Sequence, residues 1–379
     1  MRIGRYDAAV SGEIEIGRSK RARQAYSFDD IAVVPARRTR DVRDVRVGWQ
    51  LDAYHVDLPV MASPMDSVMS PDTAILVGRL GGIGVLDLEG LWTRYEDPSP
   101  AYEQLTEPAD QVTTTRRLQQ LYAEPIKAEL IEARLAEIRA AGVPVAGALS
   151  PARTQQFADV IERAGVDFFV IRGTTVSAEH VDEAENTLNL KEFIYRFDVP
   201  VLVGGCATYR MALHLMRAGA AGVLVGFGGG ATHTTASVLG IEVPMASAVA
   251  DVAEARRDYL EESGGRYVHL IADGAVGRSG DIAKAIACGA DAVMVGSPLA
   301  RATEAPGRGW HWGPEAWHAT LPRGERVFFE QVGSLAEVVN GPSHLPDGTM
   351  NLVGGLRKAM AFTGYTDIKS FQRIDVMVH

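Results

Sequence analysis

The chain has 379 residues, of which 46% are hydrophobic and 23% charged, and its formal net charge at pH 7 is −10. This composition supports a large hydrophobic core and excludes the disordered and fibrous classes. The acidic balance argues against a protein that binds duplex nucleic acid, because such a surface needs clustered Lys and Arg to neutralise phosphates. One large domain is allowed, since barrels of alternating strands and helices commonly exceed about 250 residues.

Cysteine content and hydropathy indicate the compartment. Only two cysteines, Cys206 and Cys288, occur, which excludes a disulfide framework and a four-thiolate metal site. No apolar run approaches the about 20 residues that a membrane helix needs, and residues 1–24 lack the apolar segment of a signal peptide. We therefore expect a soluble, cytoplasmic protein with no membrane partner.

Eight short apolar runs recur along the chain with helical segments between them. They lie at residues 58–62, 82–86, 144–148, 167–171, 200–203, 223–225, 267–272 and 292–295. Each run is continuously apolar rather than alternating, which is typical of strands covered on both faces. Glycines such as Gly81, Gly165 and Gly289 follow the helical segments, where glycine closes a helix. The pattern predicts an α/β fold, a (β/α)8 TIM barrel, with an open doubly wound sheet as the alternative.

Two segments interrupt this repeat. Residues 87–142 enlarge the connection after the second predicted strand, and residues 303–350 are rich in Gly, Pro, His and Trp with weak periodicity. In a barrel, such segments extend the βα loops over the strand ends, so we expect the second to form a C-terminal cover. Neither is long enough for an independent domain of ordinary size, so a single barrel domain is predicted over residues 1–379.

The connections after the seventh and eighth predicted strands suggest a ligand. Gly274, Gly277, Gly280 and Gly296 lie near helix starts, where unpaired backbone N–H groups favour an anion, and they predict a phosphate site. Asp273 ends the seventh strand at the mouth of the barrel. It is interpreted either as a turn cap or as a carboxylate that accepts two ribose hydroxyls. The second interpretation would select a nucleotide over a simple phosphate.

A glycine-rich loop follows the sixth predicted strand. Residues 226–235 have the sequence Gly-Phe-Gly-Gly-Gly-Ala-Thr-His-Thr-Thr. Such a loop bends sharply or lets a ligand approach the backbone closely. Its unusual member is His233, because an imidazole titrates near neutral pH and can act as an acid or a base. A histidine that only hydrogen-bonds a ligand or the backbone is the other interpretation.

Further motifs occur in a fixed order over nearly the whole chain. They include Tyr26-Ser27-Phe28-Asp29-Asp30, Ala62-Ser63-Pro64-Met65-Asp66, the loop 226–235, Ala272-Asp273-Gly274, Gly296-Ser297 and Gly354-Gly355-Leu356-Arg357. Together they resemble the motifs of IMP dehydrogenases and GMP reductases. The lack of an inserted CBS-domain pair is most similar to the actinobacterial IMP dehydrogenase-related branch. The resemblance implies a TIM barrel, a purine mononucleotide (IMP, XMP or GMP), NAD or NADP(H), and a homotetramer.

The resemblance also implies a set of residues that contact the nucleotide. These are Ser63, Met65, Asp273, Gly274, Gly296 and Ser297. Asp273 matches the ribose ligand, whereas the last three match phosphate-binding positions. In the glycine loop, Gly226 and Gly228 match positions on the cofactor side, and Gly228, Gly230 and His233 match a possible site for a monovalent cation such as K+.

The sequence differs from the family motif at the position of the catalytic residue. The family reaction needs a thiolate that adds to C2 of the purine while a hydride passes to or from the nicotinamide. His233 stands at that cysteine position, where its imidazole could act as an acid or a base or could itself attack C2. The candidate catalytic residues are His233, Thr235 and Cys206, of which Cys206 is either a relocated thiol or a buried structural cysteine.

The cofactor side departs as well. Arg172 stands where the family has an Asp that binds the nicotinamide ribose, and Arg172 and Thr174 are the candidate cofactor-binding residues. Arg172 could instead bind an added phosphate, which would favour NADPH. The Arg-Tyr flap that activates water in the dehydrogenases has no counterpart in residues 340–350.

Two functions therefore remain open. The first is an oxidoreductase that converts IMP to XMP with NAD, or reduces GMP with NADPH. The second is a non-catalytic or weakly active purine-nucleotide-binding relative with a regulatory role. An FMN-dependent barrel is a remote third possibility.

Overall fold

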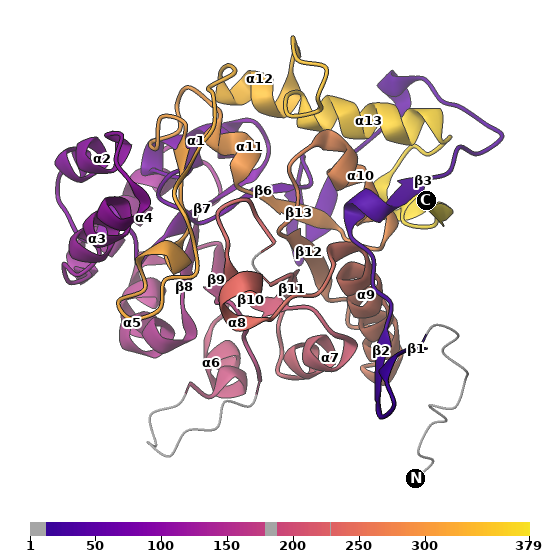
Figure 1. Cartoon of the computed structure of the whole chain (residues 1–379), viewed down its shortest axis with the longest axis horizontal. Coiled ribbons are helices and arrows are strands. Elements are labelled where there is room, and N and C mark those ends of the chain that lie inside the picture. The colour runs from indigo at the N-terminus through magenta and orange to yellow at the C-terminus, as the bar shows by residue number, and fades with distance from the viewer. Residues whose placement is uncertain (1–12, 179–187, 228) are drawn as a thin grey trace.

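Eight parallel strands close into a barrel in the computed structural model, which describes residues 13–178, 188–227 and 229–379 (Figure 1). In spatial and chain order the strands are β6 (Val60–Ala62), β7 (Ile83–Asp87), β8 (Ala146–Leu149), β9 (Phe168–Arg172), β10 (Val201–Cys206), β11 (Gly222–Val225), β12 (His269–Asp273) and β13 (Ala292–Val295). Each overlaps one predicted run. Hydrogen bonding of β13 to β6 closes the sheet, which excludes the open doubly wound alternative.

The interior of the barrel explains why the runs are continuously apolar. One face of each strand fills the interior, where side chains such as Met61, Phe168 and Ile271 are fully buried. The other face packs beneath the surrounding helices, and both faces are therefore removed from water. The hairpin of β4 (Trp49–Leu51) and β5 (Tyr54–Val56) belongs to the same interior cluster.

Helices surround the barrel. The main ones are α1 (Pro71–Arg79), α4 (Ala128–Ala140), α5 (Pro151–Ala164), α6 (Leu190–Arg196), α7 (Tyr209–Arg217), α9 (Met245–Glu262), α10 (Ser279–Ala287) and α13 (Leu352–Phe362). Gly165 ends α5 with a φ of 68°, in the left-handed region that glycine adopts without strain. Within the described parts of the chain, no helix is long and apolar enough to cross a membrane.

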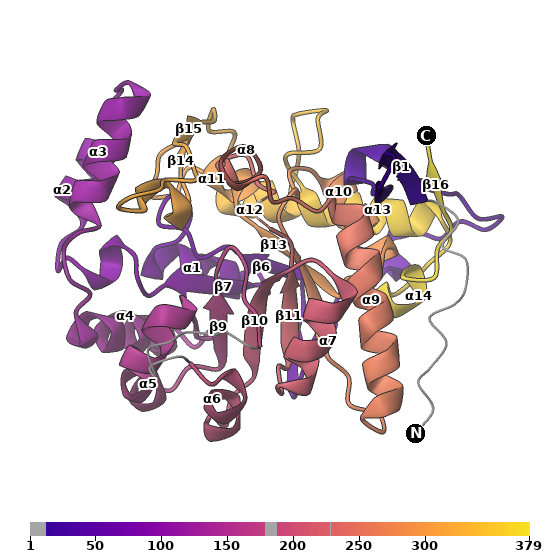
Figure 2. The same ribbon diagram turned by 60° about the horizontal axis from the view of Figure 1, so that its bottom comes forward.

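The two irregular segments pack against each other over the strand ends. The insertion, residues 87–142, contains α2 (Ser99–Thr106) and α3 (Gln111–Leu121) ahead of α4. The cover segment, residues 303–350, contains β14 (Trp310–His311), the 3-10 helix η4 (Pro314–Trp317), β15 (Val327–Phe328) and α12 (Leu335–Asn340). Figure 2 shows α2 and α3 beside β14 and β15, on the side toward which the barrel strands point.

An aromatic cluster joins the insertion to the cover segment. The rings of Tyr122 and Trp317 stack at 4.7 Å with an interplanar angle of 5°. Nε1 of Trp312 donates to the hydroxyl of Tyr122 at 2.9 Å. Gln119 Nε2 donates to the carbonyl of His318 at 2.9 Å. Segments far apart in the sequence thus form one body above the mouth of the barrel.

Candidate functional site

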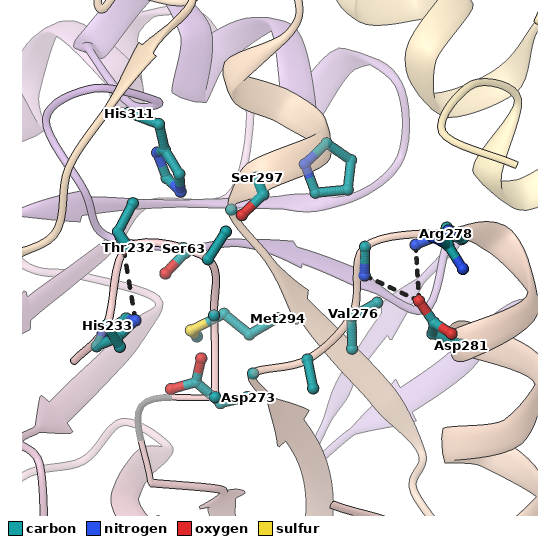
Figure 3. Close-up of a pocket in the computed structure, with 18 of the residues that line it drawn as sticks. Ser63, Thr232, His233, Asp273, Val276, Arg278, Asp281, Met294, Ser297 and His311 are labelled. Carbon is teal, nitrogen blue, oxygen red and sulfur yellow. Dashed lines mark hydrogen bonds between the residues drawn. The ribbon is translucent and has the colours of Figure 1, made fainter. Parts of the chain in front are cut away.

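A cavity of about 400 Å³ opens at the carboxyl ends of the barrel strands (Figure 3). Its walls come from the chain after β6, the glycine loop, the connections after β12 and β13, and the cover segment. Figure 3 shows His233 at one end and Arg278 with Asp281 at the other, and Asp273 and Ser297 lie between them. This is the barrel face that carries active sites, and the volume is typical of small-ligand sites.

The six residues predicted to contact the nucleotide all line this cavity: Ser63, Met65, Asp273, Gly274, Gly296 and Ser297. They come from three different strand ends, which only barrel closure brings together. Arg172, Gly230 and His233 line the same cavity. Gly228 lies outside the described residues.

The remaining predicted residues lie elsewhere. Thr174 lines a smaller, adjoining cavity. Thr235 begins α8 (Thr235–Leu239), and its buried hydroxyl has no hydrogen-bond partner within the described residues. Gly226 lines neither cavity; its φ is 144°, and a Cβ there would lie 2.1 Å from the carbonyl oxygen of Asp273. Gly226 therefore brings the glycine loop against β12 rather than facing a ligand.

Cys206 is also outside the two cavities. Its side chain is fully buried in the core beneath the helices, and burial raises the pKa of its thiol to about 12. Burial likewise raises the pKa of Cys288 to about 11. A reactive cysteine needs an accessible thiolate, so these surroundings support the interpretation of Cys206 as a structural cysteine.

At the end of the cavity where a phosphate is predicted, the hydrogen-bond donors differ from the expected backbone N–H groups. The backbone N–H groups of Gly277 and Arg278 donate to Oδ2 of Asp281, at 3.0 Å and 2.9 Å, so the Gly277 amide is already engaged. Gly280 does not line the cavity. Arg278 and Arg301 also line it, and Nη1 of Arg301 donates to Oγ1 of Thr349 at 3.0 Å.

These arginines add charged donors for an anionic ligand. The sequence could have indicated Arg278, which lies between the glycines of the same connection. Arg301 follows the short helix α11 (Ser297–Ala300) and carried no such indication.

An ion pair crosses the mouth between β9 and β12. Nε of Arg172 donates to Oδ2 of Asp273 at 3.0 Å, and each side chain is 12% exposed. Burial alone would lower the pKa of Arg172, but the charges of Asp273 and Glu315 outweigh it and raise that pKa. Arg172 is thus already balanced by carboxylates, which weakens the expectation that it binds an added phosphate.

A contact between a histidine and a carboxylate lies beside this ion pair. Nε2 of His233 is 3.1 Å from Oε2 of Glu315, with the side chains 6% and 11% exposed. The two atoms are close but not aligned for a hydrogen bond, and neither has another partner within the described residues. Burial raises the pKa of Glu315, but the nearby charges of His233 and Arg172 outweigh burial and lower it to about 2. Glu315 lies in the weakly periodic cover segment, so the sequence did not indicate it.

His311 is a buried neutral imidazole at the same end. Burial, together with the charge of His233, lowers the pKa of His311 to about 3. Its Nδ1 lies 2.8 Å from Oγ of Ser67, and that hydroxyl donates to the carbonyl of Trp312 at 3.0 Å.

The smaller cavity has a volume of about 210 Å³ and lies over the ends of β7, β8 and β9. Arg172 lines both cavities. Nη2 of Arg323 donates to Oγ1 of Thr174 at 3.1 Å, while the buried Nε of Arg323 has no partner within the described residues. Trp317 adds an aromatic surface. Polar groups beside an aromatic ring suit a planar heteroaromatic ligand.

The possible site for a monovalent cation stays a prediction, because Gly228 lies outside the described residues. The carbonyl of Gly230 accepts from the N–H of His233 at 3.1 Å, and the His233 ring faces Glu315. The described residues contain no group of three or more His, Cys, Asp and Glu side chains that could hold a metal.

Comparisons with known proteins agree with the architecture. A family model described as the IMP dehydrogenase / GMP reductase domain matches residues 25–319. An uncharacterized oxidoreductase of Mycolicibacterium smegmatis is 50% identical over 372 residues, which cover 96% of this chain and 99% of that protein. An uncharacterized oxidoreductase of Mycobacterium tuberculosis is 51% identical over 373 residues, covering 96% and 99%.

A solved structure is similar over almost the full length. The crystal structure of an IMP dehydrogenase/GMP reductase-like protein from Corynebacterium glutamicum matches with a TM-score of 0.93 and 49% identity, covering 97% of this chain and 98% of that chain. The family model covers most of this chain, and the relatives extend over nearly all of it. The chain therefore belongs to the IMP dehydrogenase/GMP reductase family.

Proposed function

We propose that this chain is an oxidoreductase that binds a purine mononucleotide in the larger cavity and exchanges a hydride at C2 of the base. The observation that carries the proposal is the lining of that cavity. Asp273 supplies a carboxylate for ribose hydroxyls, and Ser297, Arg278 and Arg301 supply donors for a phosphate. His233 lies at the opposite end, where the base would be placed.

The smaller cavity is the proposed position of the nicotinamide. Thr174 and Arg323 would hold its polar groups, and Trp317 would face its ring. When bound, a nicotinamide supplies the acceptor or donor of the hydride. Because Arg172 borders both cavities, its pairing with Asp273 keeps a carboxylate and a guanidinium fixed where the two ligands approach each other.

Nucleotide binding without turnover is the second candidate. One observation favours it: the thiol position of the family holds His233, and both cysteines are buried with raised pKa values. Under this candidate the larger cavity still binds a nucleotide, and the protein acts by occupying or sensing it.

One experiment separates the two. Purified protein is mixed with IMP and NAD, or with GMP and NADPH, and the absorbance of the reduced nicotinamide is followed while calorimetry measures nucleotide binding. Turnover supports the oxidoreductase. Binding without any absorbance change supports the second candidate, and absence of binding to IMP, XMP and GMP contradicts both. Light scattering on the same sample tests the proposed homotetramer.

A further inference from the structure

The ion pair of Arg172 with Asp273 and the contact of His233 with Glu315 form the wall between the two cavities. His233 and Asp273 line the larger cavity, Glu315 lines the smaller one, and Arg172 lines both. The four side chains follow one another in the order Asp273, Arg172, Glu315 and His233, so the guanidinium lies between two carboxylates and the second carboxylate lies beside the imidazole. The imidazole at the family's thiol position is therefore backed by a buried carboxylate.

Glu315 lies in a packed part of the cover segment. It lies on η4, and its carbonyl accepts from the N–H of Arg323 at 2.9 Å. Trp317, two positions on, stacks against Tyr122 of the insertion. The carboxylate is thus anchored on a packed element and not on an exposed loop, which is what a group that orients another side chain requires.

The two imidazole nitrogens of His233 face different surroundings. Nε2 faces Glu315 at 3.1 Å, whereas Nδ1 is 3.4 Å from Oγ1 of Thr232. A Cβ on Gly230 would lie 3.2 Å from Nδ1, so the glycine keeps that edge of the ring uncrowded. A carboxylate beside one nitrogen of a histidine favours the proton on that nitrogen and leaves the other as the base.

We infer that Glu315 positions His233 as the base that accepts a proton from the water molecule that adds to C2 of the purine. Water then takes the place of the thiolate nucleophile of the family. The inference rests on the proposed function. In the oxidative direction, the oxygen of water bonds to C2, one O–H bond of that water breaks, and its proton passes to Nδ1 of His233. The electron pair of the C2=N3 bond moves to N3, and its return accompanies departure of the C2 hydride to the oxidised nicotinamide. In the reductive direction, the reduced nicotinamide delivers a hydride to C2, and the electron pair of the C2=N3 bond moves to N3. That electron pair then returns while the bond between C2 and the amino nitrogen breaks, and protonated His233 gives its proton to the departing ammonia.

The kinetic test compares Glu315→Gln with Glu325→Gln. Glu325 is an exposed residue of the same cover segment and serves as the matched control. We expect Glu315→Gln to lower kcat about 100-fold or more, as for loss of general-base catalysis, with the nucleotide KM changed less than about threefold. Glu315→Asp, which keeps the charge, should recover part of the rate, and Glu325→Gln should match the parent protein.

An activity-independent readout uses the imidazole nitrogens. In ¹⁵N spectra at a pH where the ring is neutral, the His233 signals, identified by their loss in His233→Gln, should show the proton on Nε2. Glu315→Gln should shift the proton toward an equal share between the nitrogens, while calorimetric nucleotide binding persists.

The outcomes separate the two proposals. If the parent protein is active and Glu315→Gln leaves both kcat and the His233 signals unchanged, the role of Glu315 is overturned and the proposed function stands. Absence of turnover in the parent protein with every nucleotide and cofactor pair overturns the proposed function, and the role of Glu315 in that reaction with it. A rate loss in Glu325→Gln equal to that of Glu315→Gln also overturns the specific role of Glu315.

Discussion

The two cysteine thiols of this chain have low reactivity. Burial raises the pKa of Cys206 to about 12 and that of Cys288 to about 11, so neither is a thiolate near neutral pH. Because the family reaction uses a thiolate and neither cysteine supplies one, the imidazole of His233 is a remaining candidate catalytic group. The residue-level question is therefore whether the reaction proceeds without sulfur.

Replacing Cys206 by Ala should leave turnover within about twofold and cost only about 1 kcal/mol of stability, because a small buried side chain is shortened. Treatment of the parent protein with iodoacetamide under native conditions should leave the rate unchanged as well. The rate and the mass of the protein are measured together. Rapid inactivation that accompanies a single modification at Cys206 would contradict this prediction.

Replacing Asp273 by Asn should weaken nucleotide binding by at least about tenfold, since it removes the charged acceptor for ribose and the carboxylate that pairs with the largely buried guanidinium of Arg172. Calorimetry with IMP or GMP measures the loss. Asp375→Asn, at an exposed position, is the control. Equal affinity of the parent protein and Asp273→Asn would show that the site was assigned wrongly.

At the scale of elements, the insertion and the cover segment act as one unit. Tyr122 is the joint between them. Its hydroxyl accepts from Nε1 of Trp312 at 2.9 Å and donates to Oδ2 of Asp66 at 2.6 Å, all within a buried region. This joint carries η4 and therefore the carboxylate of Glu315, so a change far from the cavity should reach the site through it.

Tyr122→Phe should lower the free energy of unfolding by about 1–3 kcal/mol, because it leaves a buried indole N–H and a buried carboxylate each short of one partner. Tyr95→Phe is the matched control: its hydroxyl makes one hydrogen bond, to the carbonyl of Leu121 at 2.9 Å, and the loss should be smaller. Denaturant unfolding measures both. Equal losses would indicate that Tyr122 is not the main joint.

At the scale of the whole molecule, His311 links stability to pH. Its pKa is about 3 in the folded protein and about 6.5 in an unfolded chain. Between these two pH values His311 is protonated in the unfolded chain and neutral in the folded protein. The stability contributed by neutral His311 is thus fully present above about pH 6.5 and is lost as pH falls through that range, by up to about 1.4 kcal/mol per pH unit.

His311→Asn should therefore flatten the decline in unfolding free energy between pH 7 and pH 5. In that window Glu315 does not interfere, since its pKa is about 2 and its stabilising charge is lost only below about pH 4.3. His344→Asn, at an exposed position, should leave the slope unchanged. The free energy of unfolding is measured by denaturant at each pH. Parallel slopes for His311→Asn and the parent protein would contradict the prediction.

The sequence by itself determined the strands, the glycines that end helices, and the position of Asp273 at the end of a strand, where it lines the larger cavity. These depend on local rules: a strand buried on both faces must be apolar throughout, and a residue at a strand end of a barrel must face its mouth. The tertiary structure decided the partners. Only barrel closure and the packing of the cover segment place Arg172 against Asp273 and Glu315 against His233. Each pairing joins two segments that are far apart in the sequence. The local pattern of either segment does not predict the pairing, because the energy of the contact depends on the burial and charge of both side chains in the folded protein.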